Sequence, residues 1–281
     1  MQDLKSVKIQ ESGCCQMTHD YRKGRGGMQS GPQPHTRDVR WEIVHEIAER
    51  ARAAHGDSLL AVGVYGSMAR GTDAPYSDVE MLCVLRNDAS HESHEWSVGP
   101  WKAEVGVLSR AAIICDAGTL DFDWSLTQGA YLDLHAIHDP AHFFPTLREH
   151  VFGHSVSQFD QELHATLIGE LYEVVAKVRN ALETGHHDYL PLLVAKTATV
   201  ATFAIGLANR HCYTGAAVML REALALDDRP DGYDDLCRLV MRGDLTDARR
   251  ILGLCDALWM GVELWASNKG ITLYESRRVP F

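Results

Sequence analysis

The residues best suited to chemistry are Asp78 and Glu80, at the start of an apolar run over residues 79–85. Because they lie two apart on a strand, they point to the same face, roughly 6–7 Å apart along it. Strands rarely bury carboxylates without a partner, so the pair indicates either a metal site or a solvated sheet edge. Carboxylate oxygens are ligands that Mg²⁺ accepts, and the functional interpretation is therefore a magnesium site at Asp78 and Glu80.

Gly66 and Ser67 form a second candidate feature, between an apolar run at 59–65 and a short helix predicted to open at SMAR. A glycine at such a junction lets a ligand approach the backbone, and a helix N-terminus offers free N–H groups and partial positive charge. With the Ser67 hydroxyl, the turn predicts a phosphate cradle. Such turns are common and mostly structural, so this pair alone is weak evidence.

The order of these features carries more weight than either feature alone. A strand, Gly-Ser, a spacer, acid-x-acid and a second strand follow one another within residues 59–85. Carboxylates beside a phosphate cradle can hold Mg²⁺, and two such ions about 3.5–4 Å apart can clamp the attacking and leaving oxygens of a phosphoryl or nucleotidyl transfer. The combination therefore favours transfer chemistry over a solvated edge.

The elements around these residues predict an N-terminal α/β domain over residues 36–155. Apolar side chains recur at helical spacing between Val39 and Ala51, and Gly56 ends that run. Apolar runs at 59–65 and 79–85 and an alternating segment at 101–108 predict three strands, with a loop containing Gly and Pro over 71–78. Residues 1–35 have no periodicity and are predicted to be a disordered extension.

After about residue 155 the pattern becomes helical, which predicts an all-α bundle domain over residues 156–281. Residues 159–185 carry an apolar stripe of helical period, and the almost wholly apolar segment 190–211 is predicted to be the central helix. Two further helices are expected within 232–243 and 245–270, each ended by glycine. The predicted fold class is therefore α+β.

Composition sets limits on location and partners. The net charge is −11 and no basic patch is visible, which argues against nucleic acid as a partner. The acidic excess favours cationic partners, although solubility alone explains it equally well. Seven scattered cysteines without a CxxC pair indicate reduced thiols. With no signal peptide and no run of membrane-spanning length, the expected location is the cytoplasm, away from membranes.

The motif VYGSMARGTDAPYSDVEMLCV resembles the DNA-polymerase-β-like nucleotidyltransferase superfamily. Together with SHEW, WKAEV, NRHCYT, GYDDLCRLVMRG and RRVPF, it is similar to the aminoglycoside 4′-O-nucleotidyltransferases of the kanamycin group, from about Val39 to Phe281. The resemblance implies a nucleotidyltransferase domain with a mixed sheet and flanking helices, followed by the bundle. It also implies Mg²⁺-dependent transfer of a nucleoside monophosphate from ATP or another triphosphate to the 4′-hydroxyl of an aminoglycoside, releasing pyrophosphate. A homodimer with sites at the subunit interface is expected.

The resemblance also assigns roles in the helix after residue 160, which we expect to pack against the first domain. Glu173 matches the general base and Lys177 the contact to the nucleotide phosphate. From spacing alone these two would be an ordinary surface ion pair. Gly169 stands where the family is expected to carry a further acid, which puts one substrate contact in doubt.

The remaining candidates complete the predicted site. Glu104 is either a third metal carboxylate or a ligand for an ammonium group of the drug, and the sequence does not separate these. The predicted catalytic residues are Asp78, Glu80 and Glu173. The predicted nucleotide-binding residues are Gly66, Ser67, Arg70, Ser77 and Lys177, and the predicted substrate-binding residues are Glu95, Lys102, Glu104 and Glu170.

Two other functions compete with this hypothesis. One is a nucleotidyltransferase that acts on RNA or on a protein, of the toxin–antitoxin type, and the missing basic surface argues against RNA. The other is a non-catalytic nucleotide-binding protein of the same fold. The presence of Ser67, Asp78, Glu80 and Glu173 argues against a decayed site.

Overall fold

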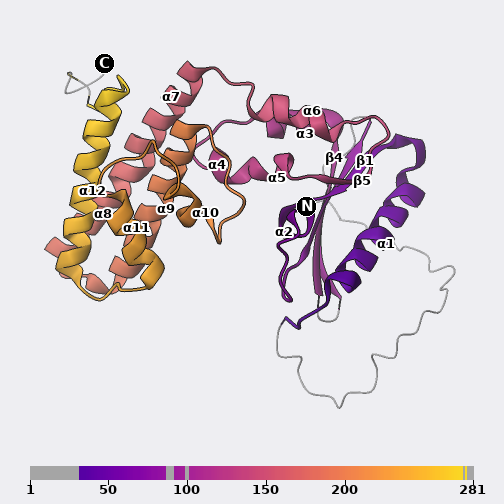
Figure 1. Ribbon diagram of the computed structural model, residues 1–281, viewed down its shortest axis with the longest axis horizontal. Coiled ribbons are helices and arrows are strands. Elements are labelled where there is room, and N and C mark those ends of the chain that lie inside the picture. The colour runs from indigo at the N-terminus through magenta and orange to yellow at the C-terminus, as the bar shows by residue number, and fades with distance from the viewer. Residues whose placement is uncertain (1–31, 87–91, 99–100, 275, 277–281) are drawn as a thin grey trace, which may run out of the picture.

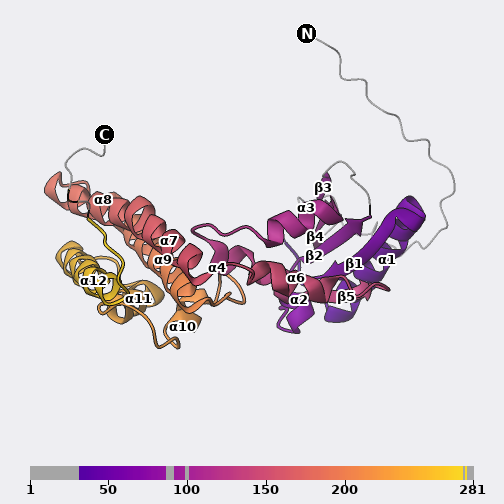
Figure 2. The same ribbon diagram turned by 90° about the horizontal axis from the view of Figure 1, so that it is seen from above.

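The computed structural model describes residues 32–86, 92–98, 101–274 and 276. Of the extension predicted over 1–35, residues 1–31 lie outside this described part. Figures 1 and 2 show a lobe built on a β-sheet and a second lobe built of helices, with α4, α5 and α6 between the sheet and the bundle.

The first lobe contains a mixed sheet of five strands in the order β3-β4-β2-β1-β5. β2 and β4 are parallel, and the other neighbouring pairs are antiparallel. The mixed sheet confirms the α+β fold class and contains all three predicted strands. The strands are β1 Leu59–Val64, β2 Val79–Leu85, β3 Glu92–Val98, β4 Trp101–Ser109 and β5 His135–His138.

Helices cover both faces of this sheet. α1 packs on one face, where Ile43 and Val44 meet apolar side chains of β1, β2 and β4. α3 and α6 cover the other face, where Ile113 and Leu147 lie in a second core cluster. The helical segments of this lobe are α1 Arg37–His55, η1 Gly56–Ser58, α2 Gly66–Arg70, α3 Arg110–Ala117, α4 Trp124–Thr127, α5 Gly129–Leu132 and α6 Phe144–Val151.

The second lobe is a helical bundle around α9. Most of α9 is buried, as its apolar sequence predicts, and helices α7, α8, α11 and α12 pack around it. One segment, His187–Asn209, is long and apolar enough to cross a membrane, but 67% of its apolar window is buried inside the protein. The helical segments are α7 Val156–Ala165, η2 Thr166–Leu171, α8 Tyr172–Glu183, η3 His187–Tyr189, α9 Leu190–Asn209, α10 Met219–Ala223, α11 Tyr233–Arg242 and α12 Ala248–Asn268.

The two lobes meet where α4 contacts α9. The Tyr213 N–H donates to the Ser125 carbonyl at 2.6 Å. At Gly206 on α9, a Cβ would lie 2.3 Å from the Cβ of Ser125, so only glycine permits this approach. The Trp124 ring also packs edge-on against Phe159 of α7, with centroids 4.9 Å apart. The helix that carries Glu173 was expected to pack on the first lobe, and the contact described here is made by the preceding helix α7, at Phe159.

Candidate active site

The strand register brings the predicted acids together on one face of the sheet. Glu80 on β2 lies opposite Glu104 on β4, and Glu104 in turn lies opposite Glu95 on β3. Paired residues on neighbouring strands share a face, so these three positions form one row. The Glu95 side chain itself lies outside the described residues. Asp78 comes directly before β2, and its Oδ2 lies 3.8 Å from the Nζ of Lys102 on β4.

Two independent features explain why residue 66 is a glycine. Its φ is +70°, a left-handed conformation that residues with a Cβ rarely adopt. A Cβ there would lie only 1.9 Å from the Oε2 of Glu80 and 3.0 Å from its carboxyl carbon. We expected the glycine to let a ligand approach the backbone, whereas in the structure it is the Glu80 carboxylate that makes this close approach. The Tyr65 N–H also donates to the Glu80 carbonyl, at 3.0 Å.

Glu80 lies in an unfavourable environment for a negative charge. Burial, followed by the charges of Asp78 and Glu104, raises its pKa to about 7, while Arg70 and Lys102 oppose the shift. Burial and the charge of Glu80 also raise the pKa of the Tyr65 hydroxyl. Mutually repelling carboxylates of this kind are relieved by a bound cation.

The donor set fits Mg²⁺. Among the residues that the structure describes, no group of three His, Cys, Asp or Glu side chains is arranged to hold a metal ion. Mg²⁺ usually keeps several waters and takes one or two protein carboxylates together with substrate phosphates. Asp78 and Glu80 would therefore hold the metal, and Glu104 remains available for either of its two predicted roles.

Four of the five predicted nucleotide contacts, Gly66, Ser67, Arg70 and Ser77, lie around the same turn, whereas Lys177 lies on α8. The Ser67 carbonyl accepts from the Thr72 N–H at 2.9 Å, which folds the following loop back on the Gly-Ser turn. The Ser77 hydroxyl accepts from the Ala74 N–H at 3.0 Å and so holds the end of this loop, just before Asp78. Arg70 lies close enough to lower the pKa of Glu80, and its Nη1 donates to Asp133 at 2.7 Å.

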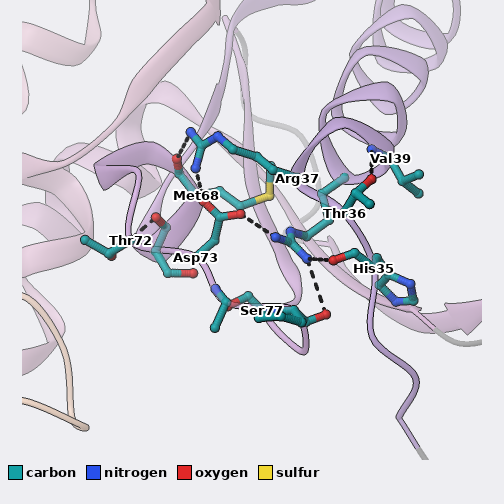
Figure 3. Close-up of polar contacts among 12 residues, drawn as sticks. His35, Thr36, Arg37, Val39, Met68, Thr72, Asp73 and Ser77 are labelled. Atoms are coloured by element: carbon teal, nitrogen blue, oxygen red, sulfur yellow. Dashed lines mark hydrogen bonds and ion pairs between the residues drawn. The ribbon is translucent and has the colours of Figure 1, made fainter.

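The loop over 71–78 is held by an ion-pair cluster that the sequence analysis missed. Asp73 accepts from both Arg37 and Arg40 of α1. The side chains of Asp73 and Arg40 are 1% and 3% exposed, so this pair is almost fully removed from water. Figure 3 shows Arg37 reaching across to Asp73 and Met68, and the Arg37 Nη2 donates to the Met68 carbonyl at 3.2 Å.

Backbone contacts reinforce this cluster, which we call the arginine clamp (Arg37, Arg40 and Asp73). The His35 N–H donates to the Pro75 carbonyl at 2.8 Å, and the Arg40 Nη1 donates to the His35 carbonyl at 3.0 Å. A signal was present in the sequence, because Arg40 stands on the same helical face as Ile43 and Val44. An arginine on an otherwise apolar face favours a buried acid as its partner, but sequence alone does not identify that acid as Asp73.

The predicted residues of α8 form a separate group. The Lys177 Nζ lies 2.5 Å from the Glu173 Oε1, and these side chains are 52% and 59% exposed. The hydrogen bond and charge of Lys177, followed by the charge of Lys196 on α9, lower the pKa of Glu173. Lys196, which the sequence analysis did not single out, also lies 4.0 Å from Glu170.

The backbone before Glu173 departs from a regular α-helix. Residues Thr166–Leu171 form a π-helical turn, η2, that contains both Gly169 and Glu170. Such turns rotate the residues that follow them and are frequent at functional sites. A Cβ at Gly169 would meet no atom within 4 Å, so open space surrounds the position where a further acid was expected.

Within one chain, the two groups are apart. The charges that shift Glu80 all come from α2, β2 and β4 and the residues next to them, whereas those that shift Glu173 come from α8 and α9. Both views place α8 in the helical lobe, away from the sheet (Figures 1 and 2). The structure thus unites Asp78, Glu80, Lys102 and Glu104, and separately unites Glu170, Glu173 and Lys177.

Known proteins resemble this chain over nearly its full length. The family described as KNTase C-terminal domain matches residues 141–272. An aminoglycoside nucleotidyltransferase (4′) of a Bacillus species is 37% identical over 252 residues, which cover 90% of this chain and 100% of that protein. The aminoglycoside nucleotidyltransferase (4′) of Staphylococcus aureus matches with the same identity and coverage.

More distant matches are partial or weak. A putative protein adenylyltransferase of Methanocaldococcus jannaschii is 38% identical over 45 residues, 16% of this chain and 31% of that protein. The crystal structure of a nucleotidyltransferase-like protein from Exiguobacterium sibiricum aligns with a TM-score of 0.47 at 12% identity, covering 83% of this chain and 75% of that one. The identity of 37% along the whole length of the first two relatives shows that the chain belongs to the aminoglycoside nucleotidyltransferase (4′) family, a family of enzymes.

Proposed function

We propose that the protein transfers the adenylyl group of ATP to the 4′-hydroxyl of an aminoglycoside, with Mg²⁺ as cofactor and pyrophosphate as the second product. The observation that supports this most strongly is the row of carboxylates around Gly66, with the pKa of Glu80 raised to about 7 by burial, Asp78 and Glu104. Bound Mg²⁺ would neutralise phosphate oxygens and favour attack at phosphorus. The likeness to relatives that are named for the 4′ position supports the acceptor hydroxyl.

Each candidate residue of the sheet lobe has a separate role in binding the nucleotide. Asp78 and Glu80 hold the metal, and the Ser67 hydroxyl and Arg70 contact the triphosphate from the turn after β1. Lys102, at 3.8 Å from Asp78, reduces the negative charge that would otherwise repel the phosphates. A cytoplasmic location is part of this proposal, since ATP is the donor.

Glu173 serves as the general base and is supplied by a second copy of the chain. Within one chain it does not join Asp78 and Glu80, which we call the metal acids, so a homodimer that places α8 of one subunit beside the sheet of the other would complete the site. In the free protein Lys177 pairs with Glu173 and lowers the pKa of Glu173, which makes that carboxylate a weaker base. When Lys177 turns to a nucleotide phosphate, the pair opens and Glu173 becomes free to accept the proton of the sugar hydroxyl.

The direct test is incubation of the full chain with ATP, Mg²⁺ and kanamycin, followed by pyrophosphate detection and mass spectrometry of the drug. We expect one added AMP group at the 4′-oxygen. A kanamycin derivative without the 4′-hydroxyl should release no pyrophosphate, because the nucleophile is missing. Equal modification of that derivative at another ring position would show that the assigned position is wrong.

A further inference from the structure

A cavity of about 240 Å³ opens beside the metal acids, on the face of the sheet that carries Glu104. β4 forms its floor, and residues from α3, α4 and α5 form its walls. It is smaller than the roughly 300–1,000 Å³ of pockets that hold a drug-sized ligand, so it suits one ring rather than a whole aminoglycoside. Its lining includes Tyr65, Glu104, Asp116, Ala130 and Tyr131.

The chemistry of this cavity is anionic and aromatic. Glu104 lines it from the sheet and Asp116 from α3, and the described lining contains no lysine or arginine. Two tyrosine rings, Tyr65 and Tyr131, supply flat apolar surface of the kind that sugar rings contact. Burial, followed by the charge of Asp116, raises the pKa of Tyr131 to about 12, which agrees with both residues lining the same cavity.

We propose that this cavity receives an ammonium-bearing sugar ring of the aminoglycoside, with Asp116 as a ligand of the ammonium group opposite Glu104. The inference rests on the proposed function and extends it to a residue that the sequence analysis did not select. The two carboxylates would repel a polyphosphate. Binding an uncharged nucleobase would not require two negative charges in the cavity. Because Glu104 lies directly across from Glu80, a ring seated here is held beside the metal-bound phosphate.

The test compares Asp116→Asn, which removes one charge with little change of shape, with Asp57→Asn, the same change at an exposed position outside the cavity lining. Hydrogen bonds to charged groups are worth about 1.5–3 kcal/mol, so Asp116→Asn should raise the KM for kanamycin roughly tenfold or more. The KM for ATP should stay unchanged, and Asp57→Asn should behave as the unsubstituted protein does. Kanamycin derivatives acetylated at single amines locate the partner, because one derivative should lose the effect of Asp116→Asn.

A second variant, Ala130→Leu, fills the cavity without changing charge and should also raise the KM for the drug alone. Circular dichroism and thermal melting confirm that each variant is folded. An unchanged KM for kanamycin in Asp116→Asn, with normal turnover, overturns the cavity assignment. A rise confined to the KM for ATP would instead make the cavity a nucleobase site. Absence of pyrophosphate release from the unsubstituted protein would reject the proposed function itself, so the two failures are distinguishable.

Discussion

Glu80 is the proposed metal ligand and also packs closely against the turn that follows β1. Its carboxylate rests against the backbone of Gly66, and burial together with Asp78 and Glu104 raises its pKa to about 7. A residue in this state is half protonated near neutral pH, and a metal ligand must be deprotonated to bind. If Glu80 binds Mg²⁺ as proposed, the affinity for the metal depends on the protonation of this carboxylate.

The first prediction is that Mg²⁺ affinity rises between pH 6 and pH 8, because protons compete with the metal for Glu80 below its pKa of about 7. Removing the Glu104 charge with Glu104→Gln should move the midpoint to lower pH. Lys102→Met removes a charge that lowers the pKa and should move the midpoint to higher pH. Titration calorimetry with a non-hydrolysable ATP analogue measures these shifts, and an affinity that is flat over this range would contradict the assignment.

The second prediction concerns Gly66→Ala. A left-handed backbone costs a residue with a Cβ about 1–2 kcal/mol, and the new methyl group would collide with the Glu80 carboxylate. We expect a folded protein of reduced melting temperature with Mg²⁺-dependent turnover lowered by at least about tenfold, since Glu80 must leave its position. Gly185→Ala is the control, because Gly185 shares the positive φ but no atom lies within 4 Å of its Cβ position. Equal losses of activity in both variants would mean that strain alone is responsible.

The third prediction concerns Glu173, whose carboxylate is exposed and paired with Lys177. Glu173→Gln preserves shape and removes basicity, so it should lower kcat by about 10²–10⁴-fold while both substrates still bind. Steady-state kinetics at saturating ATP and kanamycin give the answer. If kcat survives and only the drug KM rises, Glu173 is an ammonium ligand and the base must lie elsewhere.

At the scale of elements, the loop between the Gly-Ser turn and Asp78 depends on helix α1. Both ends of this loop carry site residues, and its middle is tied down by the arginine clamp. If this loop moved, the buried ion pair would be separated and a charge would be left without its partner. Such a separation costs free energy, so the pair holds the loop in place. The clamp therefore positions Ser67 and Asp78 relative to each other, although none of its members is expected to touch a substrate.

The fourth prediction tests this positioning role with Asp73→Asn. Breaking one partner of a buried pair costs about 3–5 kcal/mol, so the melting temperature should fall clearly. The double variant Arg40→Met with Asp73→Leu replaces the pair by apolar groups and should recover much of the stability. If the clamp positions the loop, kcat stays low in the double variant although stability returns. Recovery of both would show that the clamp contributes only to folding.

The sequence predicted those elements whose patterns are local. β1 and β2 are apolar runs, β4 alternates and α9 is almost continuously apolar, and these elements were identified from residue order alone. β5, with the sequence HAIH, was not predicted, because four residues at a half-exposed edge carry no clear alternation. Its place in the sheet is decided by pairing with β1, which is a tertiary contact.

The site shows the same division. Spacing placed Asp78 beside Glu80 on one strand face, and the register that adds Glu104 to that row follows from strand pairing. Asp73 was not predicted because its partner Arg40 lies on a helix distant in sequence. Asp116 was not predicted because only the folded chain places it in the lining of the cavity. The ion pair of Glu170 with Lys196 was also missed, since it links α9 to the π-helical turn before α8.

At the scale of the whole molecule, the metal acids and Glu173 lie in different lobes, and a homodimer is the arrangement that would bring them together. Separation of this kind allows a test that does not depend on seeing the dimer. Two variants, each inactive alone, can restore one another only when the site takes residues from both subunits. Asp78→Asn disables the sheet half of a site, and Glu173→Gln disables the helix half.

The last prediction is that mixing these two inactive variants restores activity. In a mixed dimer one site receives both substitutions, whereas the other combines an intact sheet lobe with an intact α8 from the partner subunit. Random exchange of equal amounts makes about half of the dimers mixed, so recovery should approach about a quarter of the unsubstituted activity. Pyrophosphate release measured during subunit exchange follows this recovery.

As the control, Asp78→Asn mixed with Glu80→Gln should stay inactive in mixed dimers, because both substitutions lie in the sheet half and each site then keeps one defect. If Asp78→Asn with Glu173→Gln also stays inactive although mixed dimers form, each site is complete within one chain and Glu173 is not its base.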